Sequence, residues 1–121
     1  MSKTSPTQRS LALLRKTGYT VAVVERWNPH AMIRQDLFGF ADLLAIAPQM
    51  IAVQTTSGPN VSARIAKIRD NPNAALWLAA GHRIIVHGWS KRGPRGGRKT
   101  WHCREEEITE DSNAQTIPDH G

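Results

Sequence analysis

The chain has 121 residues, which is long enough for one domain and leaves little room for a second. Its longest apolar stretches, near residues 38–48 and 74–80, are too short to span a bilayer, and no apolar run of the secretory type follows Met1. The single cysteine, Cys103, excludes an internal disulfide bond, so we expect a reducing, cytoplasmic location and no membrane partner.

Positive charge is concentrated in the larger, N-terminal part of the chain. The net charge is +6, but the residues up to Cys103 carry fifteen Lys or Arg against four acidic residues, a net charge of +11. A body with this charge favours a polyanionic partner, because basic charge alone drives binding to phosphates. The alternative is a basic surface without a ligand.

The first half of the chain predicts one helix followed by three strands. A capping box over residues 5–8, with proline at the first helical position, begins a helix that Gly18 ends. Residues 19–27 are rich in β-branched side chains and predict a strand, and the polar segment after it is expected to be a loop. Residues 40–47 and 50–56 are apolar runs that predict two further strands, joined by a tight turn.

The second half predicts two helices. A loop over residues 57–60 leads into a helix over residues 61–69, which Asn60 is expected to cap. An Asn-Pro pair stops that helix, and residues 73–80 predict another.

Two strands and a tail complete the chain. Residues 83–89 and 101–108 predict strands on either side of a basic, glycine-rich turn. From Thr109 the chain is polar and acidic, so we expect a single domain over residues 1–108 and a disordered tail over residues 109–121. The order α-β-β-β-α-α-β-β predicts an α/β fold in which helices flank a mixed sheet of about five strands.

One acidic residue interrupts an apolar strand. Burying Asp42 without a partner would cost several kcal/mol, and a metal ion or a cation is the usual compensation. On the next predicted strand, Gln54 and Thr56 are polar and share one side. We expect Asp42 and this pair to meet near the strand ends. The alternatives are that Asp42 caps a turn or pairs with Arg34, and that Gln54 is an ordinary hydrogen-bonded amide.

Residues 40–45 and 51–57 resemble the motif of the PD-(D/E)XK nuclease superfamily, in which an acid on one strand is followed on the next by an acid or Gln, any residue, and Lys. Gln8-Arg9, the helix that they open and the following Gly18-Tyr19 are similar to the start of archaeal Holliday junction resolvases, where a Glu-Arg pair opens the helix. The resemblance covers residues 5–90. It implies a restriction-endonuclease-like core and a metal-dependent endonuclease that hydrolyses phosphodiester bonds in double-stranded or branched DNA, with Mg²⁺ or Mn²⁺ as cofactor and a homodimer as the active form.

The resemblance also implies a ligand set. It assigns the metal to the side chains of Asp42 and Gln54, which are then catalytic, and to the backbone carbonyl of Thr55. Glu25, in the first strand beside Arg26, and Asp36, in the loop that would place polar groups at the mouth of the site, are secondary candidates; each also fits a surface loop.

Two positions depart from the family pattern. Thr56 stands where the family has its lysine, and Gln8 stands where the resolvases have Glu; both are secondary candidates, and the capping box alone explains Gln8. We expect the missing cation from the helix over residues 61–69, where Arg64 and Lys67 flank an apolar stripe and are assigned catalytic roles. The alternatives are a solvated helix flank for these two residues, and a non-catalytic DNA- or RNA-binding module for the chain.

Other cations are expected to bind the phosphates of a nucleic acid. Glycines in the turn between the last two strands leave the backbone free to follow a polyanion. Flanking Trp89 and Trp101 are expected to pack against each other across the hairpin or to stack on bases. The predicted phosphate contacts are Arg34, Lys91, Arg92, Arg95, Arg98 and Lys99.

Overall fold

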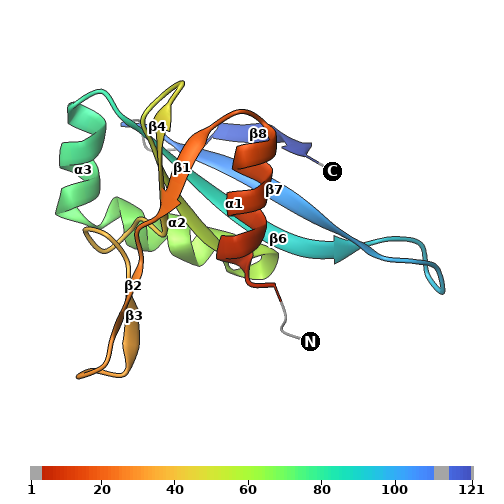
Figure 1. Cartoon of the computed structure of the whole chain (residues 1–121). Helices are drawn as coiled ribbons and strands as arrows, with labels where there is room; N and C mark the ends of the chain where they lie inside the picture. Colours follow the sequence, from red (N-terminus) through yellow and green to blue (C-terminus); the bar gives the residue numbers. More distant parts are fainter. Residues whose placement is uncertain (1–3, 111–114, 121) are drawn as a thin grey trace.

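The computed structural model describes residues 4–110 and the backbone of residues 115–120. Over this part of the chain it is an α/β fold, as predicted, with three α-helices, a mixed central sheet and a small separate hairpin (Figure 1). Among the described residues no helix is both long enough and apolar enough to cross a membrane. The elements are α1 (Pro6–Lys16), β1 (Thr20–Val23), β2 (Arg26–Asn28), β3 (Ile33–Gln35), β4 (Leu43–Ala47), β5 (Ile51–Ser57), the 3-10 turn η1 (Gly58–Asn60), α2 (Val61–Arg69), α3 (Pro72–Ala79), β6 (Arg83–Arg92), β7 (Thr100–Ile108) and β8 (Gln115–His120).

The sheet has the order β1-β4-β5-β6-β7-β8. β1, β4 and β5 form an antiparallel meander, and the crossover through η1, α2 and α3 makes β6 parallel to β5. β6 and β7 form a long antiparallel hairpin, and the five strands β1 and β4–β7 correspond to the predicted sheet.

Helices cover both faces of the sheet. α1 begins where expected, with the Ser5 hydroxyl accepting a hydrogen bond from the Gln8 N–H at 3.2 Å. Its buried leucines pack with Leu43 and Val53 on one face of the sheet. On the other face, α2 and α3 pack against alternate residues of β5 and β6, since strand side chains point in turn to opposite faces. Asn60 precedes α2, as predicted, but makes no side-chain cap bond; its amide donates to the Ser57 hydroxyl at 3.0 Å.

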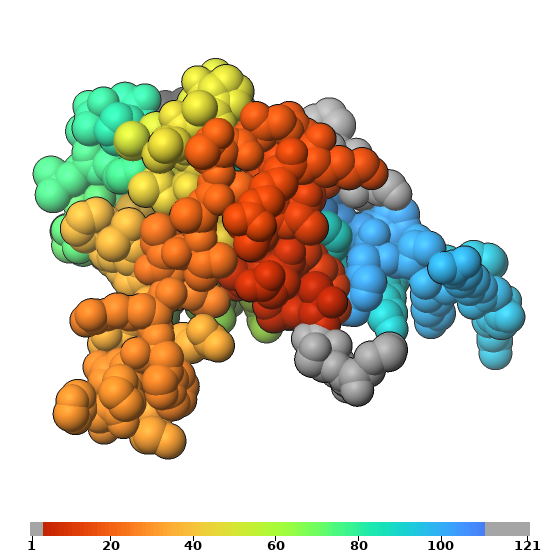
Figure 2. Space-filling view, viewed as in Figure 1, coloured from red at the N-terminus to blue at the C-terminus, as the bar shows by residue number. Residues whose placement is uncertain are grey.

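The predicted strand over residues 19–27 is divided in two, and the expected loop after it contains a hairpin. The backbone N–H groups of Val24 and Glu25 both donate to the carbonyl of Asp42, at 2.9 and 3.2 Å, and beyond this point the chain leaves the main sheet. β2 then pairs with β3 alone, forming an arm that projects from the body (Figures 1 and 2). The pairing within the arm replaces the pairing with the main sheet that a continuous strand would have made.

The predicted tail is also partly structured. β7 ends at Ile108 as expected, but Gln115–His120 pairs antiparallel with β7 as β8. The structure thus has a strand over residues 115–120 where disorder was expected, because the outer edge of β7 has backbone groups that another strand can bind. Residues 111–114 and 121, which the prediction also included, lie outside the described residues.

Candidate active site

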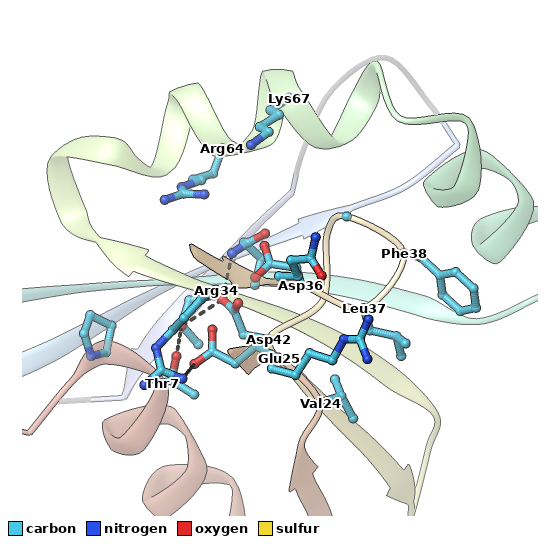
Figure 3. Close-up of a pocket in the computed structure, with 16 residues that line it drawn as sticks. Thr7, Val24, Glu25, Arg34, Asp36, Leu37, Phe38, Asp42, Arg64 and Lys67 are labelled. Atoms are coloured by element: carbon cyan, nitrogen blue, oxygen red, sulfur yellow. Dashed lines mark hydrogen bonds and ion pairs between the residues drawn. The ribbon is translucent and has the colours of Figure 1, made fainter. Parts of the chain in front are cut away.

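Three carboxylates meet where the arm joins the sheet. Glu25 lies directly before β2, Asp36 directly after β3, and Asp42 directly before β4. One oxygen from each lies within 4.8 Å of the others, and we call this group the acidic cluster (Figure 3). Asp42 is 4% exposed, while Glu25 and Asp36 are half-buried. The sequence offered Glu25 in the first strand and Asp36 at the mouth of the site as secondary candidates, and the structure brings both to Asp42 itself.

Hydrogen bonds hold Asp42 from one side. Its Oδ2 atom accepts from the Gln54 amide at 2.7 Å, from the Thr55 backbone N–H at 2.7 Å and from the Thr55 hydroxyl at 3.0 Å. The Thr55 hydroxyl is also 2.8 Å from the hydroxyl of Thr7 on α1. Because the single hydroxyl proton of Thr55 points to Asp42, Thr7 is the donor in this second bond. Three donors on one oxygen leave Oδ1 as the oxygen of Asp42 that is open to a further ligand.

Burial, together with the other two carboxylates, makes Asp42 a weak acid. Burial, reinforced by the neighbouring Asp36 and Glu25, raises the pKa of Asp42 from 3.8 to about 8, and the N–H bond from Thr55 opposes this rise. Carboxyl groups that share a buried site resist ionising together. A divalent cation would remove that resistance, since its charge favours the ionised form of each ligand.

The acidic cluster forms part of the wall of a cavity of about 930 Å³. Arg26 and Arg34 line the cavity from the arm, and Arg64 and Lys67 line it from α2. Arg34 Nη1 is 3.9 Å from Glu25 Oε1. In Figure 3 the Arg64 and Lys67 side chains leave α2 on the side that faces the carboxylates. The two helix cations therefore lie at the cavity where the sequence predicted them.

Two other predicted site residues lie away from the cavity lining. Gln8 is exposed on α1, and its neighbour Thr7 lines the cavity in its place. Thr56 is 5% exposed within β5 and is not among the lining residues. Gln54 does meet Asp42, but through its amide nitrogen, so metal binding by its oxygen and by the Thr55 carbonyl remains a prediction.

The predicted phosphate contacts of the β6–β7 hairpin are exposed. Lys91, Arg92, Arg95, Arg98 and Lys99 all lie at its outer end. The two tryptophans are not register partners, because Trp89 is opposite Cys103 and Lys91 is opposite Trp101. Trp101 instead packs under the guanidinium of Arg9, whose Cζ is 3.5 Å from the ring centroid. This contact brings α1 to the base of the hairpin.

A buried polar network was not anticipated from the sequence. His87 Nδ1 is 2.8 Å from the Ser10 hydroxyl, and Nε2 is 2.8 Å from Glu105 Oε1. The Trp89 indole also donates to Ser10 at 2.8 Å. A serine, a histidine and an acid in line form a nucleophilic triad in hydrolases, but Ser10 and His87 are both 0% exposed, so no substrate reaches them. The network fastens α1 to β6 and β7, and a histidine within an apolar strand was its signal in the sequence.

No family model, curated protein or solved structure matches this chain. The chemistry of the site is therefore argued from its geometry.

Proposed function

We propose that the protein is a metal-dependent endonuclease that hydrolyses phosphodiester bonds in DNA, including branched DNA. The observation that carries the proposal is the convergence of Glu25, Asp36 and Asp42, whose oxygens lie within 4.8 Å of one another, on a cavity lined by cations. Oxygen ligands of this kind suit Mg²⁺ and Mn²⁺. The cations that line the same cavity suit a phosphate group.

The connectivity supports the same proposal. A helix, an antiparallel three-strand meander and a helical crossover to a parallel fourth strand is the core that the resemblance to PD-(D/E)XK nucleases implies. The acid of the motif falls at the start of the second strand of the meander, and its Gln falls in the third. A likeness of fold does not establish an activity, so the connectivity adds to the site and does not replace it.

The donor set fits a divalent cation. Asp42 Oδ1, Asp36 and Glu25 would hold it, and its charge would offset the burial and the neighbouring carboxylates that raise the pKa of Asp42. A bound divalent cation would lower the pKa of a coordinated water and stabilise the charge that develops on the phosphate.

The remaining roles fall to side chains of this chain. Gln54 and Thr55 orient Asp42 through their hydrogen bonds. Arg64 and Lys67 would bind the non-bridging phosphate oxygens and stabilise the transition state in place of the family lysine. The exposed cations of the β6–β7 hairpin would bind the DNA backbone further from the cut.

One observation favours a second candidate, a DNA- or RNA-binding module without catalysis. Thr56 occupies the lysine position, is buried, and does not line the cavity. If Arg64 and Lys67 only bind phosphate, the chain would hold nucleic acid without cutting it.

A cleavage assay separates the two candidates. The wild-type chain is incubated with a four-way DNA junction, or with the linear duplex of one arm, in Mg²⁺, Mn²⁺ or EDTA. We expect metal-dependent strand cleavage that Asp36→Asn abolishes and Asp70→Asn preserves, since Asp70 is an exposed acid at the end of α2. Binding without cleavage in either metal would overturn the nuclease proposal in favour of the binding module.

A further inference from the structure

The turn that connects the arm to β4 has a costly backbone conformation. Phe38 has φ 55° and Gly39 has φ 82°. A turn with two consecutive positive φ angles strongly prefers Asn or Gly at its first central position, because a bulky side chain clashes with its own backbone there. Phenylalanine at position 38 therefore works against the stability of the turn.

The surrounding structure keeps the turn in this conformation. The Leu37 N–H donates to the Ala41 carbonyl at 2.8 Å, and the Gly39 N–H donates to the Asp36 carbonyl at 3.1 Å. The side-chain amide of Asn71, the N-cap residue of α3, donates to the carbonyl of Phe38 at 3.0 Å. Strain that its neighbours maintain in this way is typical of functional positions.

Packing does not explain the phenylalanine. Phe40, two residues further on, is 1% exposed and belongs to the hydrophobic core, whereas Phe38 is 57% exposed. Phe38 is also among the residues that line the cavity containing Asp42, and in Figure 3 its ring extends from the turn on the side away from the carboxylates. An exposed aromatic ring in a strained turn contributes little to the fold, and its place in the cavity lining points to a ligand of the cavity.

The charges around the cavity indicate which ligand this is. Arg34, Arg64 and Lys67 line the same cavity and suit the phosphates of a nucleic acid strand. A strand whose phosphate lies at the acidic cluster also carries a base within a few ångströms of that phosphate, and aromatic side chains bind bases by stacking.

We propose that Phe38 is a base-stacking residue, which binds a nucleobase displaced from its helical stack next to the phosphate at the acidic cluster. The inference rests on the proposed function. It adds a selectivity for DNA in which such a base is free, as at a junction.

Phe38→Asn is a sharp test, because asparagine suits the positive φ. We expect this variant to melt a few degrees higher than the wild type, as relief of strain predicts. We also expect it to bind a four-way DNA junction about tenfold more weakly, measured in Ca²⁺ as a non-cleaving metal. The dependence of binding on salt should be unchanged, because the substitution removes no cation that binds phosphate. Phe38→Tyr should restore the affinity.

Met32→Asn is the matched control. Met32 has φ 56°, is 70% exposed and lies in the arm outside the cavity lining, so its replacement should raise the melting temperature and leave the affinity unchanged.

Three outcomes would overturn the inference. Wild-type affinity in Phe38→Asn would show that the ring does not contact DNA. A loss of affinity that accompanies a change from dimer to monomer in sedimentation would assign Phe38 to a contact between copies of the chain. Absence of DNA binding by the wild type would remove the proposed function, and the inference with it, whereas binding that does not depend on Phe38 would leave the proposed function in place.

Discussion

Asp42→Asn should make the protein more stable at neutral and alkaline pH while abolishing the proposed metal site. The oxygen of the substituted amide can still accept the bonds from Gln54 and Thr55 that Asp42 Oδ2 accepts. The amide nitrogen would face Glu25 and Asp36 as a donor, so the repulsion within the acidic cluster is replaced by attraction.

The size of the effect follows from the pKa of Asp42. In the folded protein this pKa is about 8, against an ordinary 3.8. Between these pH values the folded state holds a proton that the unfolded state has lost, so the free energy of unfolding falls as pH rises, by about 1.4 kcal/mol per pH unit. The whole interval gives an upper bound of roughly 6 kcal/mol. Solvent in the cavity screens part of this, and we expect Asp42→Asn to be about 2–3 kcal/mol more stable than the wild type at pH 8.

Urea unfolding in EDTA from pH 5 to pH 9 measures this effect. The wild-type curve should fall toward pH 8 and then level off, whereas the Asp42→Asn curve should lack this fall. Asp70→Asn serves as the control, because it removes an exposed acid outside the acidic cluster. Added Mn²⁺ should stabilise the wild type above pH 7 and leave Asp42→Asn unchanged. Parallel curves for wild type and Asp42→Asn, or a variant less stable at pH 8, would refute the account of the acidic cluster.

Three further predictions concern other parts of the molecule. Replacing the hairpin arginines Arg92, Arg95 and Arg98 with alanine should reduce the slope of log K against log salt by about one unit for each arginine that binds a phosphate; an unchanged slope would show that DNA binds elsewhere. Lys67→Ala should lower the turnover rate much more than DNA affinity, as removal of a transition-state interaction does, whereas equal reductions in single-turnover and binding assays would make Lys67 a phosphate-binding residue only. His87→Ala should destabilise the fold by about 2–4 kcal/mol in urea unfolding, because it leaves buried polar partners without their bonds, and a stability close to that of the wild type would contradict the network.

The elements with strong local signals could be predicted from the sequence. α2 covers the expected residues Val61–Arg69, because an Asn-Pro pair follows a helical stretch with an apolar stripe. The meeting of Asp42 and Gln54 was also predictable, since each is a polar residue in an apolar run and a short turn joins their strands.

The sequence contained no strong local signal for the arm or for the pairing of β8. β2 and β3 have three residues each, too few to show an alternating pattern, and no Asn-Gly or Asp-Gly pair lies between them. β8 is polar and contains a proline, a composition typical of disordered chain, and it forms a strand by pairing with an exposed edge. Both depend on tertiary contacts that local propensity does not contain.

The acidic cluster could be predicted only in part from the sequence. Each of its residues was a candidate, but their convergence depends on the point at which the chain leaves the main sheet. The Asp42 carbonyl accepts the N–H groups of both Val24 and Glu25, which ends β1 and places the Glu25 side chain beside the Asp42 carboxylate. The return of the chain through Leu37, bridged to Ala41, places Asp36 there as well. Asp42 therefore positions its own neighbours through its backbone, a role that no pattern of side chains reveals.

The position of α2 bears on the lysine that the resemblance to PD-(D/E)XK nucleases implies at position 56, where this chain has threonine. A lysine at position 56 would belong to β5, where Thr56 is buried and does not line the cavity. Arg64 and Lys67 come instead from α2, whose Val61 and Ile68 are 0% and 2% exposed in the hydrophobic core. Because one face of α2 packs into the hydrophobic core, the orientation of the helix is fixed and Arg64 and Lys67 line the cavity. Each cation therefore starts from a defined backbone position, although its side chain is long. In the proposed enzyme, α2 thus supplies the positive charge that PD-(D/E)XK nucleases place on the strand corresponding to β5. Truncating either cation should leave the fold intact, because neither belongs to the hydrophobic core.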